Sequence, residues 1–341
     1  MSAVPKTQVL ILLPLSKETL SALREEFPKV EFHHFPDRGI DDVSKQVLGN
    51  VEIIFTRTEL PKAEDVPNLK WLHFFRTVVD VRELDDGLLE ISGLFITTNS
   101  GVTAPAYADI ALMQIYSLGY HLTQVCEAKS THKYDLEEGK YHAARLYDST
   151  IGVVGYGSVG RELARLSHAF GVELLAIKRD LMHPEDEGFI LPGHGDPDGD
   201  YFSRLYPPQA IPSMAKECDF VLVTVPYTAE TEKIINAEVF EQMKSSAYLI
   251  NLSVPGVVDL DALENAIANR LIAGAAFVQF PEYAFEEDCP LWDLDRVLIF
   301  PPFSSLIRNE EEKAVLLLIE NLKQYLNGGP LTNRIDIERG Y

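Results

Sequence analysis

Three glycines in one short segment have the types and spacing that most clearly point to chemistry. Gly155, Gly157 and Gly160 follow a run of small and β-branched residues, TIGVV, and precede a helical pattern of apolar residues. In such a segment the first glycine permits a tight turn, the second lets the backbone approach a diphosphate, and the third lets helix and strand pack closely. The amino end of the helix offers N–H groups and partial positive charge to phosphate oxygens. The pattern therefore predicts a dinucleotide-binding turn.

The residue that reads the adenosine ribose is expected about 20 residues beyond the glycines, where NAD sites carry an acid. Here Lys178 and Arg179 occupy that place, and Asp180 follows. Two cations suit a 2′-phosphate, so the sequence favours NADP over NAD. Two alternatives stay open, because the cations could be solvated surface charges and Asp180 could restore recognition of NAD. The candidate cofactor-binding residues in this part of the chain are Gly155, Tyr156, Gly157, Ser158, Val159, Gly160, Lys178 and Arg179.

The elements that must position these residues follow an alternation of short apolar runs and amphipathic segments. This alternation predicts an α/β fold with parallel sheets. Strands are expected at 9–13, 51–55, 69–75, 94–98, 150–154, 173–177, 220–225, 247–252, 273–278 and 297–300. The last six match the strand count of a Rossmann-type dinucleotide domain. Helices are expected from Ser16, as N-cap, to 27, and at 104–119 and 310–326, and residues 180–212, rich in Gly, Pro and Asp, are expected to form an exposed loop.

The composition argues against several classes of partner. Asp and Glu number 52 against 30 Lys and Arg, which gives a formal charge of −22. Such a surface repels nucleic-acid phosphates and anionic lipids, so neither nucleic acid nor a membrane is expected as a partner. The cysteines, Cys126, Cys218 and Cys289, form no metal-ligand or redox spacing. We therefore expect no metal site and a reduced, cytoplasmic setting.

Several further segments give the chain a resemblance to a known family. Together with the glycine turn, these are LKWLHFF, TTNSGVTAPAYADIAL, CDFVLVTVPYTAETEKIIN, INLSVPGVVDLDAL and CPLWDLDRVLIFPP. Over nearly its whole length the chain resembles the D-isomer-specific 2-hydroxyacid dehydrogenases. The resemblance implies a doubly wound NAD(P)-binding domain over 101–304 and a smaller, flavodoxin-like α/β substrate domain built from 1–100 plus 305–341. It also implies a homodimer formed through the nucleotide domain, and it adds Val225, Pro226 and Thr231 to the cofactor-binding candidates.

The resemblance breaks down at the residues that carry the family's reaction. Family members reduce 2-oxo acids by hydride transfer from the nicotinamide. An Arg binds the substrate carboxylate, a His protonates the oxygen, and a Glu raises the pKa of that His. The corresponding positions here are Val254, Pro302 and Tyr283. The loss of the Glu is the least secure, because Glu282 lies one residue from Tyr283 and a shift of the alignment would recover a carboxylate.

The residue inventory makes the other two losses independent of alignment. No Arg occurs between Arg204 and Arg270, and no His follows His194. The family's Gly-Ala-Gly substrate loop is also replaced, by Arg76-Thr77-Val78.

Two interpretations of the chain remain at this stage. In the first it is a non-catalytic family member that keeps the fold and the nucleotide and serves as a binding, sensing or partner protein, with an unknown small-molecule ligand. In the second it is an active oxidoreductase with relocated chemistry and another substrate. Tyr283 would then be the proton donor, and Arg76 or His73 would contact the substrate. Arg76 could equally be a solvent-facing loop residue, and His73 a packed strand residue.

Overall fold

The computed structural model describes residues 6–36, 39–77, 79, 84–134, 142–278, 285–294, 296–301 and 310–337. The chain divides into two compact units. The first contains Met1–Thr103 together with Asn309–Tyr341, and the second contains Ala104–Arg308. Tyr283 and Pro302 lie outside the described residues, as do Glu282 and Val78.

The first unit is built on a parallel sheet whose described strands are ordered β2-β1-β3-β4-β5, which is the flavodoxin-like order expected from the family resemblance. The strands are β1 Thr7–Ile11, β2 Val30–His34, β3 Ile53–Thr56, β4 Trp71–Phe74 and β5 Phe95–Thr98. The helices are α1 Lys17–Glu26, α2 Lys45–Leu48, α3 Asp86–Leu89 and α11 Glu310–Asn327, with short 3-10 turns at Ile40–Asp42 and Ala63–Asp65.

The end of the chain returns to this sheet and completes the first unit. Helix α11 lies beside α1, because Glu312 accepts a hydrogen bond from Ser16 N at 2.7 Å and another from the Thr19 hydroxyl. Beyond α11 the chain pairs with β5 through an antiparallel bridge between Arg334 and Thr97. The expected cap is confirmed, since the Ser16 side chain accepts from Thr19 N at the start of α1.

The second unit is a doubly wound sheet whose described strands are ordered β12-β11-β10-β9-β6-β7-β8, all parallel. The strands are β6 Thr150–Val154, β7 Glu173–Ile177, β8 Arg204–Tyr206, β9 Phe220–Val223, β10 Tyr248–Asn251, β11 Gly274–Val278 and β12 Val297–Phe300. The helices are α4 Ala104–Gly119, α5 Leu122–Thr131, α6 Ser158–His168, α7 Ile211–Ala215, α8 Ala237–Gln242 and α9 Leu260–Ala268, with 3-10 turns at Pro208–Ala210, Pro255–Val257 and Pro290–Asp293. This is the Rossmann arrangement, in which the order reverses beside the first strand.

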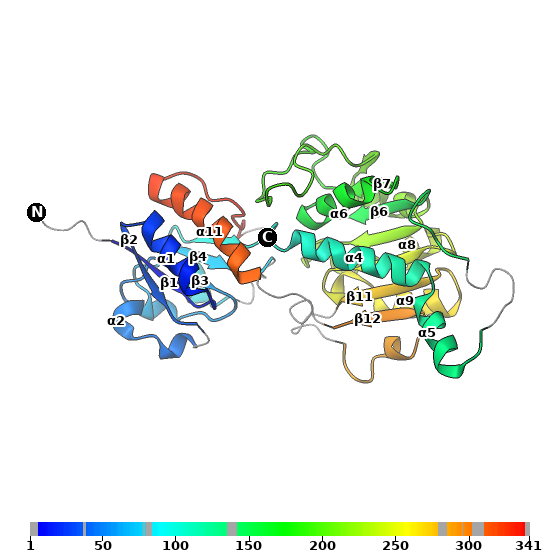
Figure 1. The fold of residues 1–341 in the computed structure, drawn as a ribbon, viewed down its shortest axis with the longest axis horizontal. Helices are drawn as coiled ribbons and strands as arrows, with labels where there is room; N and C mark the ends of the chain where they lie inside the picture. Colours follow the sequence, from blue (N-terminus) through cyan, green and yellow to red (C-terminus); the bar gives the residue numbers. More distant parts are fainter. Residues whose placement is uncertain are drawn as a thin grey trace, which may run out of the picture. The chain divides into compact units, whose positions relative to one another are not determined.

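Helices lie on both faces of the sheet in the second unit (Figure 1), and alternate residues of its strands pack into two different hydrophobic clusters. In β9, Phe220 and Leu222 pack into the cluster that includes α4 and α6, whereas Val221 and Val223 pack into the cluster that includes α7, α8 and α9. Strands that are covered on both faces read as continuous apolar runs. This burial explains why the strands of this unit stood out in the sequence.

The structure corrects the sequence-based elements at three places. Strand β2 and helix α5 were not expected, because their sequences, VEFHH and LTQVCEAKST, carry too many polar residues to stand out. The stretch 180–212 is not simply an exposed loop. It contains β8, which adds a seventh described strand to the six expected, and it buries Phe189, Leu191 and the carboxylate-bearing Asp196.

The imidazole of His73 lies inside the first unit with none of its surface exposed. Its Nδ1 is 2.7 Å from Thr97 Oγ1, which also accepts from Trp71 Nε1 at 2.8 Å. The ring packs on Phe55 with centroids 4.7 Å apart, and Nε2 has no hydrogen-bond partner among the described residues. Burial lowers the pKa of this imidazole to about 3. This position makes His73 a packed, neutral core residue and not a group open to a ligand.

The variant His73→Phe is expected to resist acidification better than the unmodified chain. The unfolded chain binds a proton on His73 below pH 6.5, whereas the folded chain excludes that proton down to about pH 3. Above pH 6.5 His73 is neutral in both states and does not lower the free energy of unfolding. Between pH 6.5 and about pH 3 the free energy of unfolding decreases as the pH falls, and the decrease reaches about 1.4 kcal/mol at one unit below the unfolded pKa. Urea unfolding at about pH 7.5 and about pH 5.5 measures the difference.

The matched control is His142→Phe, which changes an exposed histidine. It should lose as much stability between the two pH values as the unmodified chain. Identical pH profiles for His73→Phe and His142→Phe would show that the buried imidazole does not govern acid stability.

Candidate functional site

The turn between β6 and α6 is held by the strands on both sides of it. Gly155 has a φ of +105°, and an added Cβ would lie 2.9 Å from Val225 Cγ1. The N–H groups of Gly155 and Tyr156 both donate to Ile177 O at the end of β7, at 3.2 and 3.0 Å. From the β9 side, Thr224 Oγ1 donates to Gly155 O at 2.7 Å. The first glycine is therefore required both by its backbone conformation and by the close approach of a neighbouring side chain.

The second and third glycines meet opposite surroundings. Gly157 is the N-cap of α6, no side chain caps the helix there, and an added Cβ would meet no atom within 4 Å. At Gly160 an added Cβ would lie 2.8 Å from both Gly155 O and Val153 Cγ1. Gly160 thus brings the helix against the strand, and Gly157 leaves open space above the positive end of the helix dipole. This cradle fits the diphosphate of a dinucleotide.

The carboxyl ends of β7 and β9 flank this cradle, at the point where the strand order reverses. In the turn that follows β9, the oxygen of Val225 accepts a hydrogen bond from Ser253 Oγ at 2.6 Å. The hydroxyl of Thr231 donates to Pro226 O at 2.6 Å and accepts from Thr228 N at 2.8 Å. The candidates Val225, Pro226 and Thr231 therefore share one braced turn, with the Thr231 hydroxyl as its internal link.

The ammonium of Lys178, directly after β7, is bonded to the segment that follows it. Nζ donates to the backbone oxygens of His183 and Glu185, the latter at 3.1 Å. No carboxylate of a described residue lies within 4.0 Å of this nitrogen. Desolvation, and secondarily the neighbouring Arg161 guanidinium, lower the pKa of Lys178. An ammonium has three donors, so two carbonyls leave one donor for an anion.

Arg179 and Asp180 have exposed side chains that are already engaged. The Arg179 guanidinium lies 3.5 Å from Glu230 Oε2 in the turn after β9, with 54% and 78% of the two side chains exposed. An ion pair this exposed contributes little to stability and opens readily. Asp180 accepts from Met182 N at 2.9 Å and lies 2.7 Å from His183 Nδ1. Each oxygen of the Asp180 carboxylate thus already has one partner in the segment that follows β7.

The structure adds residues that sequence reasoning missed. Thr224 and Ser253 each hold a backbone oxygen of the site, and their signal in the sequence is a hydroxyl one or two residues beyond a buried strand. Arg161 and Glu162 directly follow Gly160, and both are 1% exposed. Two adjacent residues of opposite charge on a helix normally indicate a solvent-exposed face, so nothing in the sequence indicated that these two are buried.

The family's catalytic positions are described only in part. Val254 takes the position expected for Arg, before the 3-10 turn Pro255–Val257, and its side chain packs against the core of the second unit. Arg76 follows β4 in the first unit, where its backbone oxygen accepts from Asn99 N at 2.8 Å. Tyr283 and Pro302 lie outside the described residues. The cofactor candidates are thus brought together in the second unit, whereas Arg76 and His73 belong to the first.

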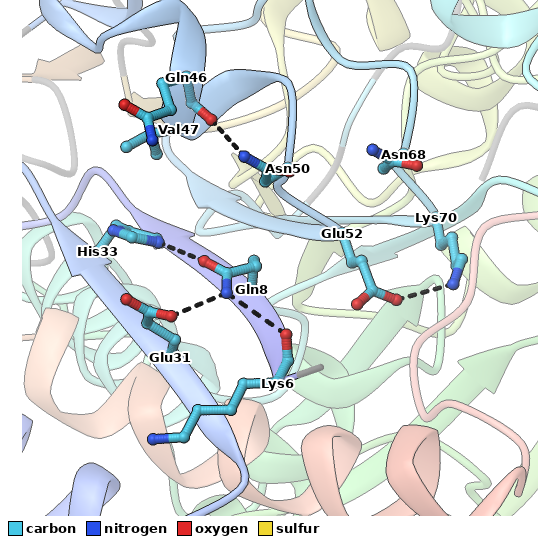
Figure 2. Close-up of a pocket in the computed structure, with 10 residues that line it drawn as sticks. All are labelled: Lys6, Gln8, Glu31, His33, Gln46, Val47, Asn50, Glu52, Asn68 and Lys70. Atoms are coloured by element: carbon cyan, nitrogen blue, oxygen red, sulfur yellow. Dashed lines mark hydrogen bonds and ion pairs between the residues drawn. The ribbon is translucent and has the colours of Figure 1, made fainter. Parts of the chain in front are cut away.

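A separate polar pocket of about 520 Å³ opens at the amino ends of the strands of the first unit (Figure 2). Gln8 lies between two partners, with Oε1 2.6 Å from His33 Nε2 and Nε2 2.9 Å from Glu31 Oε2. Across the pocket, Lys70 pairs with Glu52 at 2.7 Å. The carboxyl ends of parallel strands, where α/β proteins place their ligands, lie at the opposite edge. Among the charged residues of this pocket, Lys70 and Glu52 pair with each other and Glu31 is bonded to the neutral Gln8.

None of the described helices is both long enough and apolar enough to cross a membrane. Within the described parts of the chain no group of three or more His, Cys, Asp or Glu side chains is arranged to hold a metal ion.

Known proteins resemble this chain in sequence and in fold. Residues 112–303 match the model of the D-isomer specific 2-hydroxyacid dehydrogenase NAD binding domain. A glyoxylate reductase of Thermococcus onnurineus (strain NA1) is 28% identical over 334 residues, which cover 95% of this chain and 94% of the relative.

Two solved structures share the fold. A D-isomer specific 2-hydroxyacid dehydrogenase from Xanthobacter autotrophicus Py2, in complex with NADPH and MES, has a TM-score of 0.78 at 21% identity, covering 99% of this chain and 100% of the other. The D-lactate dehydrogenase of Aquifex aeolicus, complexed with NAD and lactic acid, has a TM-score of 0.67 at 20% identity, covering 94% and 96%. Since the family model spans more than half of the 341 residues, the chain belongs to the D-isomer-specific 2-hydroxyacid dehydrogenase family and contains its NAD-binding domain.

Proposed function

We propose that the second unit binds a nicotinamide dinucleotide in the crevice at the carboxyl ends of β6, β7 and β9. The observation that carries this proposal is the open space over Gly157 at the uncapped amino end of α6, within a domain matched by the family's NAD-binding model. The nicotinamide would supply a hydride. The residues of this chain would hold the diphosphate at the cradle and the adenosine between the ends of β7 and β9.

NADP is the proposed preference of this site. The ammonium of Lys178 is bonded to two backbone oxygens, with no carboxylate of a described residue within 4.0 Å, and Arg179 lies 3.5 Å from Glu230 in an exposed ion pair. A 2′-phosphate would bring a negative charge beside both cations, whereas a 2′-hydroxyl would bring none. Calorimetry should therefore give a lower Kd for NADP than for NAD, and tighter binding of NAD would contradict the preference.

The variant Gly157→Ala is expected to fold normally and to bind the dinucleotide at least about tenfold more weakly. Its Cβ meets no protein atom within 4 Å, so it occupies only the space proposed for the diphosphate. A loss of at least about 1.4 kcal/mol follows when the phosphates cannot reach the helix end. Thermal melting and calorimetry with NADP measure the two properties separately.

The matched control is Gly160→Ala, whose Cβ would lie 2.8 Å from Gly155 O. It should lower the melting temperature, unlike Gly157→Ala. Normal affinity for NADP in Gly157→Ala, or no binding of either cofactor to the unmodified chain, would reject the proposed site.

We further propose that this member does not reduce 2-oxo acids by the family's Arg, Glu and His mechanism. Valine at 254 cannot bind a carboxylate, and no His follows His194 to serve as general acid. Loss of a general acid alone lowers rates by roughly 10²–10⁴-fold. The chain would then act as a nucleotide-binding protein whose output is binding and not turnover.

Turnover with glyoxylate, pyruvate or hydroxypyruvate is therefore expected below about 0.1 s⁻¹, against an enzyme median of about 10 s⁻¹. Absorbance of NADPH and NADH follows the reaction, with the Thermococcus onnurineus glyoxylate reductase as positive control. Turnover near the median would contradict the proposal and favour relocated chemistry. In that case Arg76→Ala and Tyr283→Phe should abolish it.

A homodimer through the second unit is the proposed assembly. An aromatic patch, defined as Tyr116, Tyr120, Tyr147 and Phe170, leaves 38%, 50%, 63% and 42% of these residues exposed. Tyr116 stands at its centre, with ring centroids 6.1 Å from Tyr120 and 6.3 Å from Phe170. Clustered exposed aromatics are typical of protein interfaces. Tyr116 belongs to α4, which is part of the nucleotide domain. The family resemblance implies dimerisation through that domain.

Light scattering should therefore give about twice the 38.2 kDa chain mass for the unmodified protein. The double variant Tyr116→Glu with Tyr120→Glu should give the monomer mass, because two carboxylates cannot be buried in an apolar interface. Leu271→Glu, at another exposed apolar residue of the same unit, should remain dimeric. A monomeric unmodified chain would refute the assembly.

A further inference from the structure

The segment between β7 and β8, residues 180–203 and here called the insert, is fastened to helix α6 by a buried guanidinium. Arg161 is 1% exposed. Its Nη1 donates to Asp196 O at 2.5 Å, and its Nη2 donates to Pro184 O and to Glu185 O, the latter at 3.0 Å. Its Nε lies 3.4 Å from Asp186 Oδ2. One side chain of α6 therefore gathers backbone from both ends of the insert.

Two further side chains next to the glycine turn hold the insert from the same direction. The Tyr156 hydroxyl donates to Asp196 Oδ2 at 2.5 Å, and its ring lies under the Arg161 guanidinium, 4.8 Å from the ring centroid. Glu162, also 1% exposed, accepts from Gly195 N at 2.6 Å and lies 2.9 Å from His194 Nδ1. Burying three ionisable groups is costly unless each is bonded, so this fastening is specific.

The insert in turn holds Lys178. The two carbonyls that accept from its ammonium belong to His183 and Glu185, and the oxygen of Glu185 also accepts from Arg161. Lys178 and Arg161 thus share one acceptor, and their two cations lie close enough for the guanidinium to lower the pKa of the amine. A chain of contacts runs from α6 through the insert to the cation that follows β7.

We propose that the insert is a clamp that fixes Lys178 for a 2′-phosphate and that Arg161 is its positioning residue. The inference rests on the proposed dinucleotide function and adds the feature that selects NADP. A lysine at a strand end is ordinarily mobile and strongly hydrated, and ordering it on binding costs entropy. The clamp removes most of that cost beforehand and leaves one donor and the charge for the phosphate. Arg161 itself contacts the insert and not the ligand.

A double-mutant cycle tests this indirect action. Calorimetric Kd values for NADP and NAD are measured for the unmodified chain, Arg161→Met, Lys178→Met and the double variant. Arg161→Met should weaken NADP about tenfold and NAD less than about twofold, since one charge-assisted hydrogen bond is at stake. In the Lys178→Met background the Arg161→Met change should have no further effect on NADP, because its target is gone.

The matched control is Arg296→Met. Arg296 also donates to a backbone oxygen, Ile267 O at 2.8 Å, at the β12 side of the same unit. It should leave the ratio of the two Kd values unchanged. Where thermal melting shows that Arg161→Met does not fold, Tyr156→Phe removes only the hydroxyl bond to Asp196 and should weaken NADP in the same direction, by about threefold.

The outcomes separate the clamp from the function beneath it. Equal weakening of NADP and NAD by Arg161→Met, or an undiminished tenfold effect in the Lys178→Met background, overturns the clamp and leaves dinucleotide binding intact. Failure of the unmodified chain to bind either cofactor overturns the dinucleotide function, and the clamp falls with it. Selective weakening of NADP that disappears without Lys178 supports the clamp.

Discussion

The packing of α6 against β6 at Gly160 is the contact on which the nucleotide site depends. The absence of a side chain there lets the helix approach the strand closely enough that a Cβ would stand 2.8 Å from Gly155 O. Because the helix is this close, its amino end sits directly over the turn, with the end of β7 bonded on one side and Thr224 on the other. The lack of a side chain at Gly160 thus brings together the amino end of the helix, the open space at Gly157 and the flanking strand ends.

Helix α6 also carries two charged side chains, Arg161 and Glu162, that are buried where the insert covers the helix. Arg161 and Glu162 are adjacent and opposite in sign, yet they do not pair with each other in the contacts described. Both bind the same stretch of the insert, Arg161 at Asp196 O and Glu162 at Gly195 N, and Arg165 pairs with Glu162 at 2.6 Å. Removing one partner of such a buried set typically costs about 3–5 kcal/mol, so the insert and the helix are coupled strongly.

The scaffold and the chemistry of this family are physically separable. The strands and the glycine turn are maintained by burial and backbone geometry, which do not involve the positions of the family's Arg and His. Val254 packs into the core beside the turn Pro255–Val257 without disturbing β10. The geometry of the nucleotide site is therefore set independently of the residues at those positions.

The sequence alone was sufficient for much of the second unit. Helix α4 and strands β6, β7 and β12 have the bounds that the sequence predicts, because buried parallel strands and apolar helices are continuous local patterns. The dinucleotide turn was equally local, since its three glycines each answer a short-range steric demand. The valine at position 254, where the family resemblance implies an Arg, could likewise be read directly from the sequence.

Tertiary structure alone decided the partners of the polar residues. His73 appeared as a candidate contact and lies in the core, where only the neighbouring strands and Phe55 reveal its burial. Arg161 was not singled out in the sequence and is buried, because the insert that covers it begins 19 residues further along the chain. Hydrogen bonds between distant segments leave no periodic trace in a sequence, since any polar residue can satisfy the pattern and only the fold chooses its partner.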